Sequence, residues 1–431
     1  MLGVYRILTF FFYPLFIILI YLRLFLKKED QKRYKEKIFS SAFDVKRNKD
    51  NKLIWFHAAS IGETLSILPV IEEINKLNKS VDFLITTVTL SSAELLKNKL
   101  DIYSNVSHRF FPLDTERLAE RFLDKWKPNI ACFVDSEIWP NFLFKIKEKN
   151  IPLTLINARI TKKTFKKWNM FPSFAEKVFN NFDLCLPCSE ESKKNLEKLH
   201  VKKLSYVGNL KFTINVKREN LNKTNIEILN NFKVWCAVST HEGEEVVAIK
   251  THLEIKKKYK NILTIIIPRH ISRVPYIKNL SNNFKLNVQI LNDGDIIKND
   301  KEILIINSFG VLYKYFNYCK NIFIGKSLIK KLSLVGGQNP IEAAKLDCRI
   351  YFGPYIYNFQ EVYDFLKSKN MAVQVNNEYD LSANIVESLK NPKQIDFKNL
   401  SLLNSYGDQI LQHTIEELNK LVKIKNENIK T

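Results

Sequence analysis

Short apolar segments rich in β-branched and aromatic residues alternate with helical patterns along the chain after residue 50. The first segment, "LIWFHA" at 53–58, precedes a helical pattern in "LSILPVIEEINKL". The next, "VDFLITTVT" at 81–89, precedes "SSAELLKNKL", and the same order continues beyond it. Because strands that alternate with helices build parallel sheets with helices packed on them, this alternation predicts an α/β protein.

The alternation is interrupted at 213–231, "TINVKRENLNKTNIEILNN", a polar segment without a strand pattern. It starts again at "VWCAVST" and ends in a long helical pattern near "QILQHTIEELNKLV". A chain of 431 residues also exceeds a single typical core. We therefore expect two doubly wound domains, residues 29–215 and 216–431, with ligands in a cleft at the carboxyl ends of their strands.

The N-terminus carries an uncharged apolar run, "ILTFFFYPLFIILIYL" at 7–22, between Arg6 and Arg23. The run is slightly shorter than the roughly 20 residues of a full membrane span. Lysines follow it rather than precede it, which is the reverse of a cleaved signal peptide. We expect residues 1–28 to be an uncleaved anchor with the rest of the chain in the cytoplasm. Pro14 keeps open a second arrangement, a helix that lies in the membrane interface.

The formal net charge of +22 indicates an anionic partner, which can be nucleic acid, anionic lipid or a phosphorylated substrate. The lysines are dispersed, and no basic stripe with interleaved aromatic residues supports nucleic-acid binding. Cys185 and Cys188 in "CLPC" have the spacing of a redox or metal pair, but no second pair with zinc spacing accompanies them. Six cysteines in a chain of this length do not form a dense disulfide framework. We therefore expect the thiols to be structural and reduced.

Motifs for a dinucleotide fingerprint, a P-loop, a zinc protease or a nucleophile elbow are absent from the sequence. Polar motifs instead follow the predicted strands. They are "HAASIGE" ending at Glu63, "TTVT" at 86–89, "DSEIWPN" at 135–141, "NARI" at 157–160, "STHEGEE" at 239–245, "PRH" at 268–270 and "GGQNPIEAA" at 336–344.

Each of these motifs allows a structural and a functional interpretation. Glu63 at a helix start is either a cap for free N–H groups or a catalytic base. Arg269 directly follows a buried strand, where it is either a surface residue or a phosphate ligand. Asn339 and Pro340 fit the start of a helix, while the preceding glycines are suited to a nucleotide phosphate or ribose.

Taken in order, and together with "GNLKF" at 208–212, "GKSL" at 325–328 and "GPYIYNF" at 353–359, these motifs resemble the 3-deoxy-D-manno-octulosonic acid (Kdo) transferases of lipopolysaccharide synthesis. The resemblance covers nearly the whole chain. It implies a GT-B architecture, in which two Rossmann-like domains, one for the acceptor and a C-terminal one for the CMP-sugar, face a cleft. It also implies inverting transfer of Kdo from CMP-Kdo to the lipid A precursor (lipid IVA) at the inner membrane. No metal, cofactor or nucleic acid takes part in the reaction of that family.

The resemblance also assigns site residues. Glu63 matches the general base of the family, and Glu137 and Lys211 match residues that stabilise the transition state. The CMP-binding positions are matched by Pro268, Arg269, Phe309, Gly310, Val311, Asn339, Pro340, Ile341 and Glu342. The chain departs from the family pattern at Val311 and Asp135, where glutamate is usual, and at Lys326, where glycine is usual.

Two other functions fit parts of the pattern. A different GT-B enzyme, such as a UDP-sugar transferase or a nucleotide-sugar epimerase, would share the architecture. A membrane-tethered nucleic-acid-binding protein would share the charge of +22 but not the ordered motifs.

Overall fold

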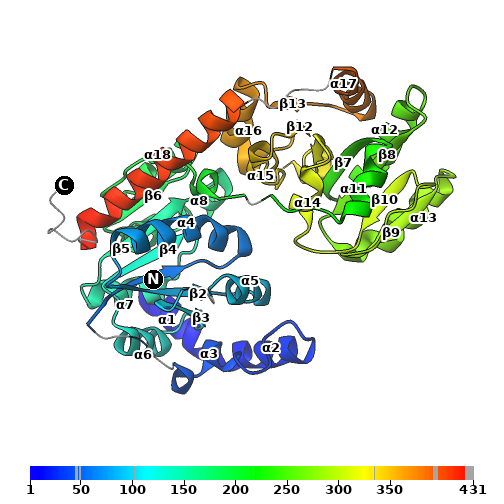
Figure 1. Ribbon diagram of the computed structural model, residues 1–431. Helices are drawn as coiled ribbons and strands as arrows, with labels where there is room; N and C mark the ends of the chain where they lie inside the picture. The colour runs from blue at the N-terminus through cyan, green and yellow to red at the C-terminus, as the bar shows by residue number, and fades with distance from the viewer. Residues whose placement is uncertain are drawn as a thin grey trace. The chain divides into compact units, whose positions relative to one another are not determined.

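The structure is a computed structural model that describes residues 1–43, 47, 50–100, 103–216, 218–333, 335–391 and 397–422. Contacts between residues divide the chain into two compact units. Unit 1 comprises Met1–Ile214 and the C-terminal stretch that starts at Tyr406, and unit 2 comprises Asn215–Ser405. Each unit is a parallel sheet with helices packed on it (Figure 1).

Unit 1 contains a six-stranded sheet in the order β3-β2-β1-β4-β5-β6. Its strands are β1 (Lys52–His57), β2 (Val81–Thr87), β3 (Val106–Phe110), β4 (Ile130–Val134), β5 (Leu153–Ala158) and β6 (Leu184–Pro187). Its helices after β1 are α4 (Ile61–Leu77), α5 (Leu90–Leu100), α6 (Glu116–Trp126), α7 (Pro140–Glu148), α8 (Lys162–Trp168), α9 (Pro172–Phe179) and α10 (Glu190–Lys198). The chain order of the strands reverses between β1 and β4, which is the usual ligand position of a doubly wound sheet.

Helices on both faces of the sheet explain why its central strands are apolar along their length. All seven residues of β2 are buried, and in β1 only Lys52 is exposed. On one face, Trp55 contacts the rings of Phe122, Phe133 and Phe142 at centroid distances of 5.0, 5.3 and 5.8 Å. Each such aromatic side chain contributes roughly 1.5–3 kcal/mol through burial, so this cluster fixes α6 and α7 against the sheet.

The N-terminal apolar segment forms two helices, α1 (Leu2–Phe11) and α2 (Tyr13–Phe25). They meet at Phe12 with a bend of 51°, and Pro14 lies in the first turn of α2. Among the described residues, no one helix has the length and apolar composition to cross a membrane, although this bent pair passes the same test when taken together. The uninterrupted run seen in the sequence is therefore broken at Phe12.

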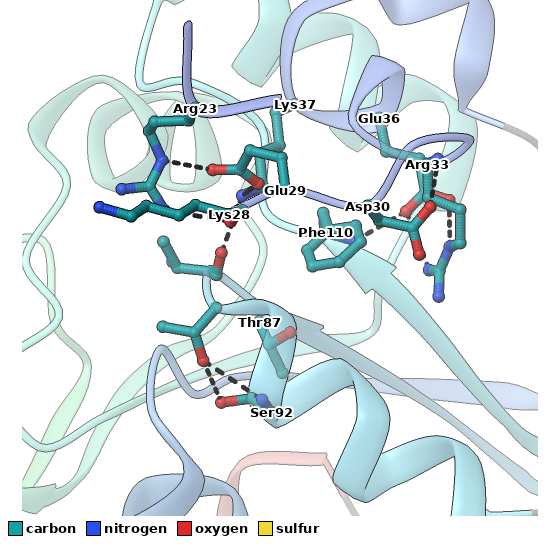
Figure 2. A network of polar contacts seen from close by, with 12 residues as sticks. Arg23, Lys28, Glu29, Asp30, Arg33, Glu36, Lys37, Thr87, Ser92 and Phe110 are labelled. Atoms are coloured by element: carbon teal, nitrogen blue, oxygen red, sulfur yellow. Dashed lines mark hydrogen bonds and ion pairs between the residues drawn. The ribbon is translucent and has the colours of Figure 1, made fainter. Parts of the chain in front are cut away.

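Buried polar contacts attach the segment that follows α2 to the sheet of unit 1 (Figure 2). Glu29 is buried and pairs with Lys37 and, at 2.6 Å, with Arg23. The ammonium of Lys37 also donates to the carbonyl of Val88 at 2.8 Å, just beyond the end of β2. Lys37 belongs to the short helix α3 (Lys35–Ile38), which is followed by the 3₁₀ turn η1 (Ser40–Ala42). Removal of Glu29 or Lys37 alone would leave an unpaired buried charge, which costs roughly 3–5 kcal/mol.

Unit 2 contains a seven-stranded sheet in the order β13-β12-β11-β7-β8-β10-β9, with parallel pairing throughout. Its strands are β7 (Lys233–Thr240), β8 (Ile262–Pro268), β9 (Val288–Leu291), β10 (Ile303–Ile306), β11 (Asn321–Ile324), β12 (Arg349–Phe352) and β13 (Ala372–Gln374). Its helices are α11 (Lys223–Asn230), α12 (Glu244–Lys256), α13 (Val274–Asn283), α14 (Leu312–Phe316), α15 (Ile341–Lys345), α16 (Gln360–Ser368) and α17 (Glu378–Lys390). Its strand order reverses between β7 and β11.

The last helix, α18 (Phe397–Val422), returns to unit 1 from Tyr406 onward. The sequence suggests one domain that runs from residue 216 to the C-terminus, and the structure differs here. Gly407 allows the return, because a Cβ at this position would lie 2.4 Å from the carbonyl oxygen of Phe212. The rings of Tyr406 and Phe212 also meet, at a centroid distance of 5.1 Å.

We predict that Gly353→Ala destabilises unit 2. A Cβ at Gly353 would lie 2.2 Å from the carbonyl oxygen of Ser327, and overpacking of this kind costs about 1–3 kcal/mol. The control is Gly62→Ala in the first turn of α4, where no atom lies within 4 Å of the added Cβ and the unfolding midpoint should not fall. Denaturant unfolding compares the two, and an unchanged midpoint for Gly353→Ala would contradict the close packing.

Candidate functional site

A group of ionisable side chains lies at the carboxyl ends of β1 and β4 in unit 1. Glu63 is in the first turn of α4, and Asp135 and Glu137 follow β4. The charges of both residues after β4 act on Glu63, and the carboxylate of Asp135 lies 3.6 Å from the ammonium of Lys211. The structure thus brings together three residues that the family resemblance singled out, Glu63, Glu137 and Lys211.

Glu63 caps its own helix. Its carboxylate accepts hydrogen bonds from the backbone N–H of Ala59 and the hydroxyl of Ser60, both at 2.7 Å, and Ser60 in turn accepts from the N–H of Glu63 at 3.4 Å. Burial, and then the charge of Asp135, raise the pKa of Glu63 to about 7. The two interpretations of this residue are therefore compatible, because a capping carboxylate with a near-neutral pKa can also accept a proton.

Glu137 has its pKa moved in the opposite direction. Burial alone would raise the pKa, but contacts with His57 at 3.3 Å and with the indole N–H of Trp139 at 2.8 Å outweigh it and hold the pKa of Glu137 below its usual value. Two neighbouring carboxylates thus have pKa values pushed apart, which is the arrangement that separates acid–base roles in enzyme sites.

His57 belongs to this group, although sequence reasoning did not single it out. The ring is fully buried and stacks on Phe111 at a centroid distance of 3.8 Å. Its Nδ1 contacts the hydroxyl and the carbonyl of Thr86 at 3.0 and 3.2 Å, and its Nε2 contacts Glu137. The pairing of His57 with Thr86 depends on the register of β1 against β2, which joins the "HAASIGE" and "TTVT" motifs. Both residues stand in motifs that the sequence shows, but their contact could be recognised only once the register of β1 against β2 was known.

Lys211 is positioned by two asparagines. Asn209 accepts from the N–H of Lys211 at 3.0 Å, and Asn157 of the "NARI" motif accepts from the N–H of Leu210 at 2.9 Å, both at the 3₁₀ turn η2 (Leu210–Thr213). The partner of Lys211, Asp135, has a left-handed backbone with φ of 59°. One carboxylate oxygen of Asp135 is buried with no hydrogen-bond partner among the described residues. Such an oxygen is available to a donor on a ligand.

The "CLPC" cysteines lie beside this group. Both thiols are free and buried, and burial raises the pKa of Cys188 to about 11. A thiol that stays protonated at neutral pH is a poor nucleophile and a poor metal ligand. Their environment fits the predicted structural role.

In unit 2, Glu244 joins the loops that follow β7 and β11. It is fully buried at the start of α12 and accepts hydrogen bonds from four backbone N–H groups, those of His241, Lys326, Ser327 and Leu328, at 3.0, 2.6, 2.8 and 3.1 Å. Gly325 makes this approach possible, because a Cβ there would lie 2.8 Å from the carboxylate. Glu244 of "STHEGEE" thus has a structural role, as has Glu245, which pairs with Arg273 at 2.6 Å.

Basic side chains lie at the ends of β7, β8 and β11 around Glu244. Arg269 follows β8 and is exposed, and its guanidinium makes no hydrogen bond or ion pair within the part of the chain that the structure describes. The rings of His241 and His270 lie 5.9 Å apart. Burial lowers the pKa of His241, and the charges of Lys326 and Arg269 lower it further. A concentration of positive charge at strand ends is suited to an anionic group.

The remaining predicted nucleotide-binding positions are also in unit 2. Asn339 accepts from the N–H of Ile341 at 3.2 Å at the start of α15, after Pro340. Glu342 in that helix bonds Tyr313 of α14, and burial raises the pKa of Glu342.

Three more of the predicted nucleotide-binding positions, residues 309–311, directly precede α14. Phe309 is exposed, Gly310 has a positive φ of 78°, and Val311 is buried at the start of α14. The N–H of Gly337 donates to the carbonyl of Lys326 at 2.7 Å. These contacts connect the Asn339 segment with the basic loops, and Pro268 ends β8 beside Arg269.

The fold can be compared with solved structures. A UDP-GlcNAc 2-epimerase from Neisseria meningitidis bound to UDP-GlcNAc superposes with a TM-score of 0.55 over 86% of this chain and 100% of that chain, at 15% identity. At this identity the likeness concerns the fold alone. Two Rossmann-like units and this likeness give an α/β fold of GT-B architecture, which confirms the predicted fold class.

Sequence comparison gives the family. Residues 32–214 match the family model described as 3-deoxy-D-manno-octulosonic-acid transferase (kdotransferase). A 3-deoxy-D-manno-octulosonic acid transferase from Rickettsia bellii is 30% identical over 426 residues, which cover 96% of this chain and 98% of the relative. One from Haemophilus influenzae is 25% identical over 378 residues, which cover 86% of each chain. The chain therefore belongs to the 3-deoxy-D-manno-octulosonic acid transferase family, and it is a glycosyltransferase.

We predict that Asp135→Asn lowers the pKa of Glu63. The negative charge of Asp135 raises that pKa, so its removal makes the ionised form of Glu63 easier to reach. NMR titration of protein with labelled glutamate carboxyl groups measures the change. Asp124→Asn, on the exposed part of α6, is the control, and the same pKa in Asp135→Asn and wild type would contradict the proximity of the two carboxylates.

Proposed function

We propose that this protein transfers Kdo from CMP-Kdo to a phosphorylated lipid A precursor (lipid IVA) by one inverting displacement that needs no bound metal. The observation that carries the proposal is the half-buried carboxylate of Glu63, with a pKa of about 7, at the strand-order reversal of unit 1. Membership of the Kdo transferase family supports the sugar, and the basic loops of unit 2 support an anionic nucleotide donor.

The acceptor side of the reaction needs a base. A sugar hydroxyl is a poor nucleophile until its proton is removed, and a positioned carboxylate contributes roughly 10²–10⁴-fold to such a step. In the proposed step, the hydroxyl oxygen bonds to the anomeric carbon of Kdo while its proton passes to Glu63. A base with a pKa of about 7 is substantially ionised at neutral pH and still basic enough to take the proton.

The donor side needs cations. As the bond between the anomeric carbon and the phosphate oxygen breaks, the electron pair leaves with the phosphate of CMP. Arg269, whose guanidinium is exposed, is the proposed ligand of that phosphate, and Pro268, the 309–311 segment and Asn339–Glu342 are the other proposed CMP contacts. Glu137 and Lys211 are proposed to stabilise charges that develop on the sugar and on the leaving group. A single displacement inverts the anomeric carbon, so no enzyme nucleophile is required.

The N-terminal helices suit an enzyme with a lipid acceptor. Large apolar side chains of α1 and α2 are exposed, among them Phe10, Phe11 and Phe25. We propose that residues 1–28 attach the protein to the cytoplasmic side of the inner membrane, by spanning it or by lying in its interface. The net charge of +22 favours an anionic membrane and a phosphorylated acceptor. We propose no nucleic-acid partner, because the sequence has no basic stripe with interleaved aromatic residues.

We predict that Glu63→Gln reduces transfer by at least about 100-fold, because the amide cannot take the proton. Donor binding should be unchanged, since the residue acts on the acceptor. Mass spectrometry of the lipid product measures transfer, and calorimetry with CMP-Kdo measures binding. Turnover close to that of wild type would remove Glu63 from the role of base.

We predict that Arg269→Ala weakens CMP binding by about tenfold or more, because a hydrogen bond to a charged group contributes roughly 1.5–3 kcal/mol. Lys278→Ala, which removes an exposed cation from α13 of the same unit, is the control. Titration with CMP and with UDP-GlcNAc compares the variants. Equal affinity of Arg269→Ala and wild type for CMP, or preference of the wild type for the uridine nucleotide, would speak against the proposed donor site.

A further inference from the structure

A hollow with a volume of about 690 Å³ lies between the N-terminal helices and α6 in unit 1. The volume is within the range of roughly 300–1,000 Å³ that is typical of ligand sites. Its walls come from α1, the start of α2, the turn after α3 and the first two turns of α6. Glu63, Asp135, Glu137 and Lys211 are not among its lining residues. The hollow is therefore separate from the carboxylate group.

The lining combines apolar side chains with arginines. Tyr13, Ile38 and Leu118 give it an apolar wall. Arg117 and Arg121, one helical turn apart on α6, are exposed at its edge. Arg121 donates to the hydroxyl of Ser40 at 2.8 Å, which leaves other guanidinium donors for a ligand. Such a surface suits a molecule with both an acyl chain and an anionic group.

The hollow is also lined by Arg6, Glu116 and Glu120, and its lining keeps an excess of positive charge. Glu116 lines it but pairs with Arg6 and Lys145, each at 3.0 Å. The Nε atom of Arg6 is buried and has no hydrogen-bond partner among the described residues. Glu120 is exposed on α6. Arg6 also pairs with Glu148 at 3.1 Å, so two carboxylates share its charge. The excess of positive charge at the hollow is therefore carried by Arg117 and Arg121, with Glu120 as the remaining carboxylate.

The position of the hollow indicates where its ligand comes from. Phe10 lines the hollow and is also 74% exposed, so the hollow continues into the apolar surface of α1 and α2. Phe11 and Phe12 extend that surface. A soluble metabolite would gain nothing from these neighbours, whereas an acyl chain would bury apolar area against them.

We propose that this hollow binds one anionic membrane phospholipid, with its phosphate at Arg117 and Arg121 and an acyl chain along Tyr13, Ile38 and Leu118. The site goes beyond the proposed transfer reaction, since it would bind a lipid that is not consumed. Thr9, another lining residue, accepts from the side chain of Asn141 at 3.2 Å, so the "DSEIWPN" segment packs against its wall.

The test measures retention of phosphatidylglycerol and phosphatidylcholine by the purified full chain, using native mass spectrometry. The double variant Arg117→Glu/Arg121→Glu should bind phosphatidylglycerol at least about tenfold more weakly, because two cations near a lipid phosphate are replaced by repulsive charges. Ser41→Trp should weaken it similarly, since an exposed lining residue would fill the hollow without any change of charge. Phosphatidylcholine should bind wild type less well.

The control is Lys125→Glu/Lys127→Glu, which makes the same charge change at the other end of α6, outside the hollow. It should retain phosphatidylglycerol as wild type does. The proposal fails if this control loses phosphatidylglycerol as strongly as Arg117→Glu/Arg121→Glu. It fails as well if Ser41→Trp binds phosphatidylglycerol as wild type does. It also fails if saturating lipid acceptor displaces phosphatidylglycerol, because the hollow would then belong to the acceptor. Transfer to an acceptor in detergent should persist in Ser41→Trp, whereas failure of the proposed function would appear as absent transfer in wild type.

Discussion

The candidate site depends on the balance between hydrogen bonding and burial at one carboxylate. Glu63 receives two hydrogen bonds from the N-terminus of its own helix, which fix its orientation. Burial and the adjacent charge of Asp135 nevertheless raise its pKa to about 7. Without the helix bonds the carboxylate would be mobile, and without burial it would be a weak base. The fold supplies both conditions, because the strand-order reversal places the loops after β1 and β4 side by side.

The strand ends of the two units carry side chains of opposite charge, acidic in unit 1 and basic in unit 2. In unit 1, three acidic residues, Glu63, Asp135 and Glu137, gather around the end of β1, with Lys211 paired to one of them. In unit 2 the buried Glu244 accepts hydrogen bonds from four backbone N–H groups, and basic side chains, His241, Arg269 and Lys326, lie at the neighbouring strand ends. In the proposed function, unit 1 supplies the proton acceptor and unit 2 supplies the anion-binding surface that a transfer from a nucleotide donor to an alcohol requires.

Much of this was predictable, since hydrophobic periodicity and helix-start chemistry are local properties of the sequence. The alternation of strands and helices predicted both sheets, and the sequence placed Glu63 at a helix start, as a cap or as a catalytic base. Contacts between distant segments were not predictable in this way. The contact of His57 with Thr86 depends on strand register, and the four bonds to Glu244 depend on the close approach of two loops at Gly325. The return of α18 to unit 1 depends on Gly407, which in the sequence is one glycine in a helical pattern.

The central claim is that an ionised Glu63 carboxylate removes the acceptor proton during transfer. Its most direct test is the rate of Kdo transfer as a function of pH, with CMP-Kdo and lipid acceptor both well below saturation, because this rate reports the pKa values of the free enzyme. The account predicts a rate that increases with pH and reaches a plateau above an inflection at about 7, the pKa of Glu63. A rate that does not change through the neutral range would contradict it.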